Sequence, residues 1–150
     1  MNAKVNLVKT MMVLLLFTEG ITLNAQETII KQTELPKTAQ QFVSKNFPGK
    51  NVIQVEKDSG IAKTEYELRF EDGTKIEFDG NGNWKEVDGK DNAAIPTGFI
   101  PNKITSYVSK NFPTHKISKI EKGLGKIEVE LTNDLDLEFN SNGDFLRIDD

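Results

Sequence analysis

The sequence contains no cysteine, and it has one histidine and one tryptophan in 150 residues. Without cysteine the chain can form no disulfide, carry no lipid on a cysteine at a cleavage site, and use no thiol as a nucleophile. The single histidine, His115, cannot by itself compose a catalytic triad or a histidine-rich metal site. The fold must therefore be held together by burial alone, and we expect no enzyme activity, no catalytic residues, no metal and no cofactor.

The chain also lacks a strong excess of either charge. Its formal net charge is −4 at pH 7, from 19 basic and 23 acidic residues. A mildly acidic chain is a poor partner for nucleic acid or for an anionic membrane surface. We therefore expect neither as the main partner.

Long apolar runs are scarce, and the clearest one lies close to the start of the chain. Lys4 and Lys9 come first, Met11 to Phe17 are apolar, and small and polar residues follow as far as Ala25. This order is typical of a secretory signal peptide, and the run is far shorter than the roughly 20 residues that span a membrane. The sequence predicts a signal peptide over 1–25, with a retained anchor as the alternative.

Cleavage of that segment would release an exported protein with no membrane insertion, in the periplasm or else outside the cell. The loss of two lysines and one glutamate would change the net charge from −4 to −5. About 125 residues would remain, enough for one ordinary domain or two half-domains that share a core.

The hexapeptide VSKNFP occurs twice, at Val43–Pro48 and at Val108–Pro113. Apolar and glycine residues before and after it also match, at an offset of 65 that shrinks to 63 and then to 61 along the chain. Such self-similarity indicates a tandem duplication. We predict a first repeat over 26–90 and a second over 91–150.

Each repeat begins with a helical pattern and continues with four strands. Apolar residues recur at helical spacing before each VSKNFP, and the proline at its end stops the helix. The segments that follow alternate apolar and polar residues, as a sheet with one buried face does. The predicted fold class is α+β: two tandem repeats, each a helix packed on a four-stranded antiparallel sheet.

Turn residues predict which side chains face away from the core. Two-residue turns at Asn81-Gly82 and Asn142-Gly143 would place Trp84 and Phe145 on the face opposite the helix, together with many acids. Like charges directly across a strand pair are destabilising, so this face gives up stability without a structural return. The predicted partner-binding residues are Trp84, Phe145, Glu67, Glu77, Glu128, Glu130 and Glu138.

The chain resembles the PepSY-like family of exported bacterial proteins, which are described as β-lactamase-inhibitor-protein-like. The resemblance covers Thr33 to Asp150. It rests on Leu35-Pro36, Asn46-Phe47-Pro48, Tyr66-Glu-Leu68, Phe78-Asp79, Gly82 and Trp84, and on Ile95–Pro101, Asn111-Phe-Pro113, Val129-Glu-Leu131, Phe139–Gly143 and Phe145. It implies that the sheets of the two repeats lie side by side as one curved surface. In the inhibitor that names the family such a surface binds a β-lactamase, but that inhibitor has disulfides, so we do not extend its activity to this chain.

Three functions remain open. The first is binding of a protein or peptide, with a basic surface as the best fit, through the aromatic and acidic face; enzyme inhibition is one form of this. The second is binding of a cation or a small cationic ligand on the acids of that face. The third is a structural role in the cell envelope. A calcium loop at Asp79–Asn83 is disfavoured, because Trp84 and Lys90 stand where that motif needs glycine and glutamate.

Overall fold

The computed structural model describes residues 26–149, so the predicted signal peptide at 1–25 lies outside the described residues. The first repeat contains β1 (Gln26–Ile29), the 3-10 helix η1 (Gln32–Glu34), α1 (Lys37–Asn46), β2 (Val52–Ser59), β3 (Thr64–Phe70), β4 (Lys75–Asp79) and β5 (Trp84–Asp88). After the short helix η2 (Lys90–Asn92), the second contains α2 (Asn102–Asn111), β6 (Ile117–Lys122), β7 (Lys126–Leu131), β8 (Asp136–Asn140) and β9 (Phe145–Asp149).

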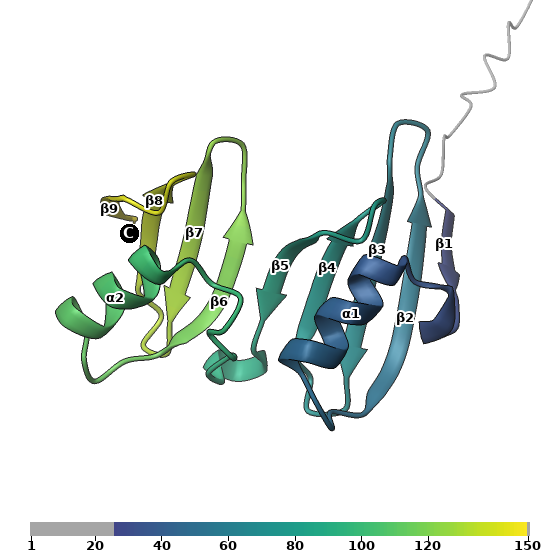
Figure 1. Ribbon diagram of the computed structural model, residues 1–150, viewed down its shortest axis with the longest axis horizontal. Coiled ribbons are helices and arrows are strands. Elements are labelled where there is room, and N and C mark those ends of the chain that lie inside the picture. Colours follow the sequence, from purple (N-terminus) through teal and green to yellow (C-terminus); the bar gives the residue numbers. More distant parts are fainter. Residues whose placement is uncertain (1–25, 150) are drawn as a thin grey trace, which may run out of the picture.

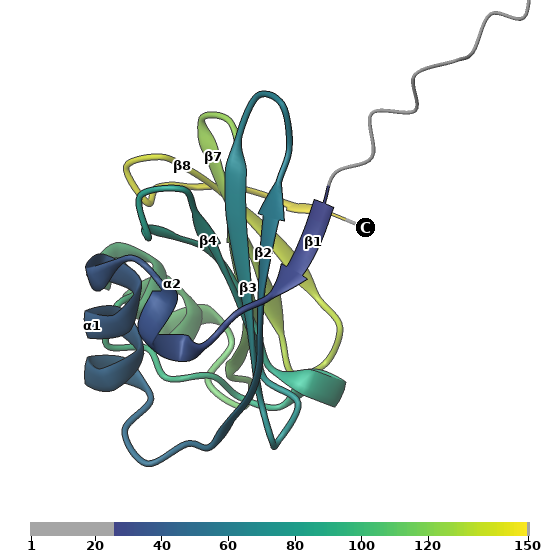
Figure 2. The same cartoon turned by 90° about the vertical axis from the view of Figure 1, so that its right-hand side faces the viewer.

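All nine strands form one antiparallel sheet in the order of the sequence, β1 to β9. The two repeats join edge to edge where β5 pairs with β6. Both α-helices pack on the same face of the sheet, and within residues 26–149 no α-helix lies over the other face (Figures 1 and 2). The predicted α+β fold with tandem repeats and adjoining sheets is therefore confirmed.

The two α-helices have the same construction, which explains the repeated hexapeptide. Each follows a proline, buries two apolar side chains against the sheet, and ends at the asparagine of VSKNFP, with the phenylalanine as its C-cap. The asparagine of each copy, Asn46 or Asn111, donates from its side chain to the carbonyl four residues earlier at 2.9 Å. The hexapeptide is thus a helix end, with Val43 and Phe47 in the core. Neither of these ten-residue helices, nor any other described helix, is long and apolar enough to cross a membrane.

A single row of apolar side chains forms the centre of the core, on the helix side of the sheet. Its members face one another directly across seven consecutive strands, and each is at most 3% exposed. They are Val55, Leu68, Ile76, Val87, Ile120, Val129 and Leu137. Because the row crosses the β5–β6 junction without interruption, both repeats share one hydrophobic core.

Strand β1 was not among the expected elements. It pairs with β2 along the edge that the four-strand prediction left open, so it covers that end of the sheet. At the other end of the described sheet, β9 pairs only with β8. An edge covered by a short extra strand is a common protection against unwanted pairing.

The expected offset of 63 over the second strand of each repeat is wrong. Leu68 faces Val55, and the residue that faces Ile120 in the second repeat is Val129. These pairs give an offset of 61 over β3 and β7. The length difference lies in one place, the hairpin formed by the first two strands after each helix, whose strands are longer in the first repeat.

Candidate functional site

The structure places Trp84 and Phe145 on the helix face of the sheet, which corrects their predicted outward orientation. Trp84 stands opposite the buried Phe78 and stacks on Phe42 of α1, with ring centroids 6.2 Å apart. Phe145 stands opposite Phe139 and stacks on Tyr107 of α2 at 4.4 Å. Both rings are half-buried and pack against the hydrophobic core. They cannot serve as anchors on the opposite face.

The reason lies in the hairpin loops. Residues 80–82 form a three-residue loop closed by Asp79 and Asn83, with Gly82 at φ 83°, where a two-residue turn was expected. A bulge follows, since Phe78 pairs with Trp84 while the preceding Glu77 pairs with Glu86. The bulge adds one residue to β5 between the loop and the regular strand pairing, so the Trp84 ring lies on the helix face and not on the outer face. The second repeat repeats this geometry, with Gly143 at φ 80° and a bulge after Phe145.

The outer face, away from the helices, carries a continuous row of glutamates. They lie directly opposite one another on the seven consecutive strands β2 to β8, one residue along from the apolar row on the inner face. They are Glu56, Glu67, Glu77, Glu86, Glu121, Glu128 and Glu138. We call this set the glutamate row.

Four of the seven predicted partner-binding residues lie in this row: Glu67, Glu77, Glu128 and Glu138. Glu130, the fifth predicted acid, lies beside the row, opposite Asp136. Of the other three glutamates in the row, Glu86 was not among the predicted binding residues, and Glu56 and Glu121 were not assigned to this face. Their strands alternate imperfectly because each contains a bulge near its start, but the 65-residue offset that links these two positions could have identified them.

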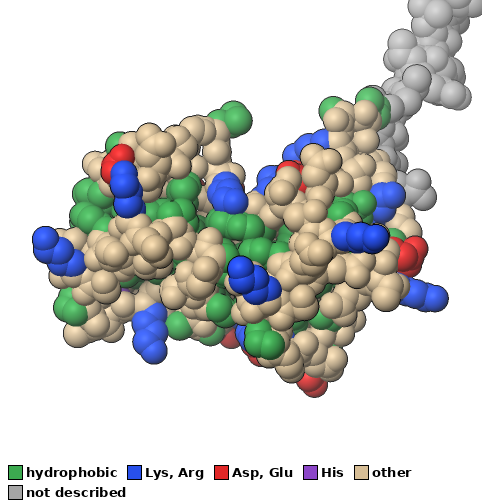
Figure 3. Space-filling view, viewed as in Figure 1, with side chains coloured by type: hydrophobic (Ala, Val, Ile, Leu, Met, Phe, Trp, Pro, Cys, Tyr) green, Lys and Arg blue, Asp and Glu red, His purple; other side chains and the backbone are tan. Residues whose placement is uncertain are grey.

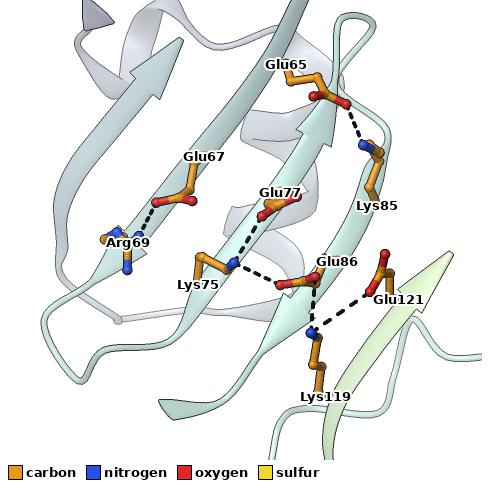
Figure 4. Close-up of polar contacts among 9 residues, drawn as sticks. All are labelled: Glu65, Glu67, Arg69, Lys75, Glu77, Lys85, Glu86, Lys119 and Glu121. Atoms are coloured by element: carbon orange, nitrogen blue, oxygen red, sulfur yellow. Dashed lines mark hydrogen bonds and ion pairs between the residues drawn. The ribbon is translucent and has the colours of Figure 1, made fainter. Parts of the chain in front are cut away.

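Ion pairs join the two repeats beneath the row (Figure 4). Glu86, only 7% exposed, contacts Lys75 at 2.9 Å and Lys119 of the second repeat at 3.3 Å. Burial by itself would lower the pKa of Lys75, but its hydrogen bonds to Glu86 and Glu77 outweigh this and raise the pKa. The lysines therefore stay charged, and neutralise the acids closest to the junction.

In the first repeat, further acids crowd on one side of the row. A shallow hollow of about 150 Å³ opens over β1 to β4. Its acidic lining is Glu27, Glu56, Asp58, Glu65, Glu67 and Glu77. Glu65 contacts Lys85 and Lys63, and the hydrogen bond from Lys85 is the main cause that lowers the Glu65 pKa. On the opposite side of the row this repeat carries Arg69 and Lys75.

In the second repeat the crowding lies on the opposite side of the row. A hollow of about 200 Å³ opens over β6 to β9, lined by one lysine, one leucine and six acids. The acids are Glu121, Glu128, Glu130, Asp136, Glu138 and Asp149. Burial raises the pKa of Glu130, and the negative charge of Asp136 across the strand pair adds to this. Glu138 behaves differently, because a hydrogen bond from Arg147 at 2.9 Å lowers its pKa.

The face that the helices cover has a different character. Figure 3 shows this side with apolar surface between the repeats and several lysines, but few acids. His115 lies here, in the segment that joins α2 to β6. In residues 26–149 no three acidic or histidine side chains converge as metal ligands would. The Asp79 carboxylate accepts hydrogen bonds from the backbone N–H groups of Asn81 and Asn83, which accounts for these loop residues without a metal.

Three solved structures share this fold at substantial sequence identity. One is described as a "putative calcium-regulated periplasmic protein" from Bacteroides thetaiotaomicron; it is 35% identical, with a TM-score of 0.78 over 83% of this chain and 97% of its own. Two come from Bacteroides vulgatus, both described as "putative periplasmic" proteins and one as of unknown function. They are 32% and 31% identical, with TM-scores of 0.78 and 0.77, over 83% of this chain and 98% and 100% of theirs.

The location that these descriptions give agrees with the periplasmic location predicted from the leader. No curated protein shows significant sequence similarity to the chain. A family model described as "Putative beta-lactamase-inhibitor-like, PepSY-like" matches residues 21–71 and 64–147, which together cover most of both repeats. With this match over both halves and the same fold in three relatives, the chain belongs to the PepSY-like, β-lactamase-inhibitor-like family.

Proposed function

We propose that this protein is a non-catalytic periplasmic binding module whose acidic outer face recognises a basic segment of another protein. The observation that carries the proposal is the glutamate row. Like charges directly across a strand pair destabilise a sheet, yet the chain repeats that arrangement on seven adjacent strands. A partner that brings positive charge would relieve this repulsion on binding.

The size of the face suits a protein better than a single ion. Seven strands spaced about 4.8 Å apart give the row a length of roughly 29 Å, comparable to the width of an ordinary protein interface. Acids on both sides widen it, and the two hollows lie at its two ends. Complementary charge of this extent would speed encounter and select against acidic partners.

Inhibition of an enzyme is one form that this binding can take, and the family description is consistent with it. A broad sheet face can cover a cleft without chemistry of its own. Here the recognition would depend on acids alone, because Trp84 and Phe145 lie on the other face.

Calcium binding is a second candidate, favoured by the "calcium-regulated" description of the relative from Bacteroides thetaiotaomicron. The best place for it is the hollow of the second repeat, where Glu130 faces Asp136 on β8; Lys119 faces Glu130 from the other side, on β6. Carboxylate oxygens are the ligands that calcium prefers. The acids of this hollow would have to close on the ion to complete its coordination.

Capture from periplasmic extract tests the main proposal. The immobilised protein should retain proteins that are released at about 0.5 M salt, where charges are screened within a few ångströms. The double variant Glu121→Gln with Glu128→Gln should lose them. Asp91→Asn with Asp134→Asn is a matched control, since it removes two exposed charges outside the sheet face at positions where asparagine tolerates the positive φ. Equal retention by both double variants would contradict the proposal.

A calcium titration separates the second candidate. If calcium is the ligand, millimolar calcium should raise the melting temperature while magnesium does so less, since ligand binding to the folded state stabilises it. Glu130→Gln should remove that increase. If calcium produces no specific increase in melting temperature while capture remains salt-sensitive, only the protein-binding function would remain.

A further inference from the structure

The aromatic pair of the first repeat is covered by residues from outside that repeat's own helix and sheet. Phe42 and Trp84 stack on each other, and Phe99 of the segment before α2 packs edge-on against both, at 5.0 and 5.2 Å between ring centroids. Lys122 of β6 places its Nζ 3.5 Å from the centre of the Trp84 ring. Thus the second repeat supplies both groups that cover this pair.

The equivalent pair of the second repeat is Tyr107 and Phe145. They stack more closely, at 4.4 Å and 13° between ring planes. In residues 26–149 their other aromatic contacts are with Phe112 and Phe139 of the same repeat. An open groove of about 710 Å³ runs over them. Its lining includes Asn102, Lys103, Ser106, Tyr107, Asn111 and Phe145.

The groove matches the place that Phe99 occupies on the first repeat. There the backbone passes beside Asn46, since a Cβ on Gly98 would lie 4.0 Å from the Asn46 side-chain oxygen. Asn111, the counterpart of Asn46 in the repeated hexapeptide, lines the groove on the second repeat. The adjoining sheet edge differs between the repeats in the same way, because β5 is covered by β6 whereas β9 has only β8 as a neighbour in the described sheet.

We propose that the groove over Tyr107 and Phe145 is a docking site for an aromatic side chain presented on a turn of a partner protein, seated as Phe99, in the turn from Thr97 to Ile100, is seated on Phe42 and Trp84. The chain itself provides the template for this contact. Edge-on packing of a third ring against a stacked pair is a favourable aromatic geometry. The exposed apolar residues of β9, Leu146 (51% exposed) and Ile148 (45% exposed), lie on the strand that continues from Phe145 and would extend the contact. This site is on the helix side of the molecule, so it is separate from the acidic face.

The probe is a peptide that copies the template, Ile95 to Pro101 of this chain (IPTGFIP), added to the isotope-labelled protein and followed by NMR. We expect saturable shifts at millimolar peptide in the amide signals of Ser106, Asn111 and Asp144, which lie in or beside the groove. A peptide with alanine at the position of Phe99 should leave these signals in place.

Ser106→Trp should abolish the shifts, because Ser106 is exposed on α2 and a large ring there fills the groove. Gln41→Trp is the matched control at the equivalent exposed position of α1, and it should bind the peptide as the unaltered chain does. Both positions are on the helix surface, so neither variant should unfold, and a thermal melt checks this.

Several results would overturn the proposal. One is the absence of saturable shifts with the unaltered chain, and another is equal shifts with the alanine peptide. Equal shifts with N-acetylphenylalanine amide would assign the groove to a small aromatic ligand. Self-association of the chain that Ser106→Trp abolishes would assign it to a second copy.

Discussion

The two repeats share the glutamate row but differ in the charges beside it. Where the first repeat has Glu65 on one side of the row, the second has Lys126; where the first has Arg69 and Lys75 on the other side, the second has Glu130 and Asp136. These pairs are equivalent at the offset of 61. The duplicated scaffold kept its core and its central acids, while the flanking positions exchanged sign.

This exchange gives one face two acidic hollows on opposite sides of the row, one in each repeat. A single repeat used twice would have placed both on the same side. For the proposed binding of a basic partner, the whole face, rather than either half, is therefore the surface to test. A basic partner would best follow the diagonal from one hollow to the other.

The largest expected effect tests whether the repeats are one folding unit. Phe78→Ala and Phe139→Ala remove equivalent, fully buried rings, and each should cost roughly 3–5 kcal/mol of unfolding free energy. Because the apolar row is continuous through β5 and β6, each variant should still unfold in one transition. Urea denaturation followed by circular dichroism and by fluorescence of the only tryptophan, Trp84 in the first repeat, measures this.

The informative case is the ring in the second repeat. In Phe139→Ala both signals should shift to the same lower midpoint. A fluorescence midpoint that stays in place while the circular dichroism midpoint falls would show that the repeats unfold independently, and the comparison of two halves in one unit would fail.

A smaller effect distinguishes the hairpin loops that orient Trp84 and Phe145. Gly82 and Gly143 both have positive φ, so alanine at either should cost about 1–2 kcal/mol in backbone strain. Gly82→Ala should cost more, because its Cβ would lie 2.7 Å from Pro36 Cβ and 2.9 Å from the Ala39 nitrogen, against 3.3 Å from Lys103 for Gly143. Gly49→Ala, at φ 78° with open space around it, measures the strain alone. Equal losses at Gly82 and Gly49 in denaturant unfolding would contradict this order.

Charge exchange should have a smaller effect still. Glu130→Arg with Asp136→Lys gives the second repeat the flank of the first, and should raise the unfolding free energy by about 0.5–1 kcal/mol because it replaces facing acids. The converse, Arg69→Glu with Lys75→Asp, should lower it by more, since it leaves the buried Glu86 without Lys75. Melting curves at low and high salt check both. Equal and opposite shifts would mean that burial of Glu86 has no part in the difference.

The smallest effect is a pH dependence of opposite sign for two neighbouring acids. The folded pKa of Glu130 is raised, so folding is favoured by protonation, and that contribution is lost as the pH rises through the folded value. Glu130→Gln should therefore raise the melting temperature slightly at pH 7 and have little effect below the ordinary glutamate pKa of 4.5.

Glu138 is the matched control. Its folded pKa is lowered by Arg147, so its contribution is present above the ordinary value and is lost as the pH falls through the folded value. Glu138→Gln should lower the melting temperature at neutral pH, and this loss should shrink in acid. If the two variants change the melting temperature in the same direction at pH 7, the assignment of paired and unpaired acids is wrong.

The sequence pattern was sufficient to predict the duplication, the α-helices and eight of the nine described strands, whereas the side-by-side sheets were expected from the family resemblance. The helical spacing of apolar residues and the proline after each helix predict helix ends at Val43–Pro48 and Val108–Pro113. The alternation of apolar and polar residues predicts which side chains of β3, β4, β7 and β8 face the core. The prediction of the outer acids depended on the same alternation. Strand β1 escaped because four residues next to the leader carry too little pattern to identify a strand.

The orientation of Trp84 and Phe145 could not be predicted from alternation. An asparagine–glycine pair is compatible with a two-residue turn and with the last part of a three-residue loop, and these alternatives differ by one residue in register. In the structure a bulge absorbs that residue, so Ile76 still faces Val87 as expected while Trp84 changes face. The missing information is the packing of Gly82 against α1, which only the folded chain provides.

The apolar row and the glutamate row lie back to back on the two faces of the sheet, and together they favour one register for the pairing of β5 with β6. If β6 docked on β5 one position out of step, Lys119 and Glu121 would turn beneath the helices and Ile120 would face water, and Glu86 would lose its contact with Lys119. A shifted register thus has two costs, since it buries charged side chains and exposes apolar ones. The carboxylates therefore favour the correct register between the two repeats, whether or not they also bind a partner.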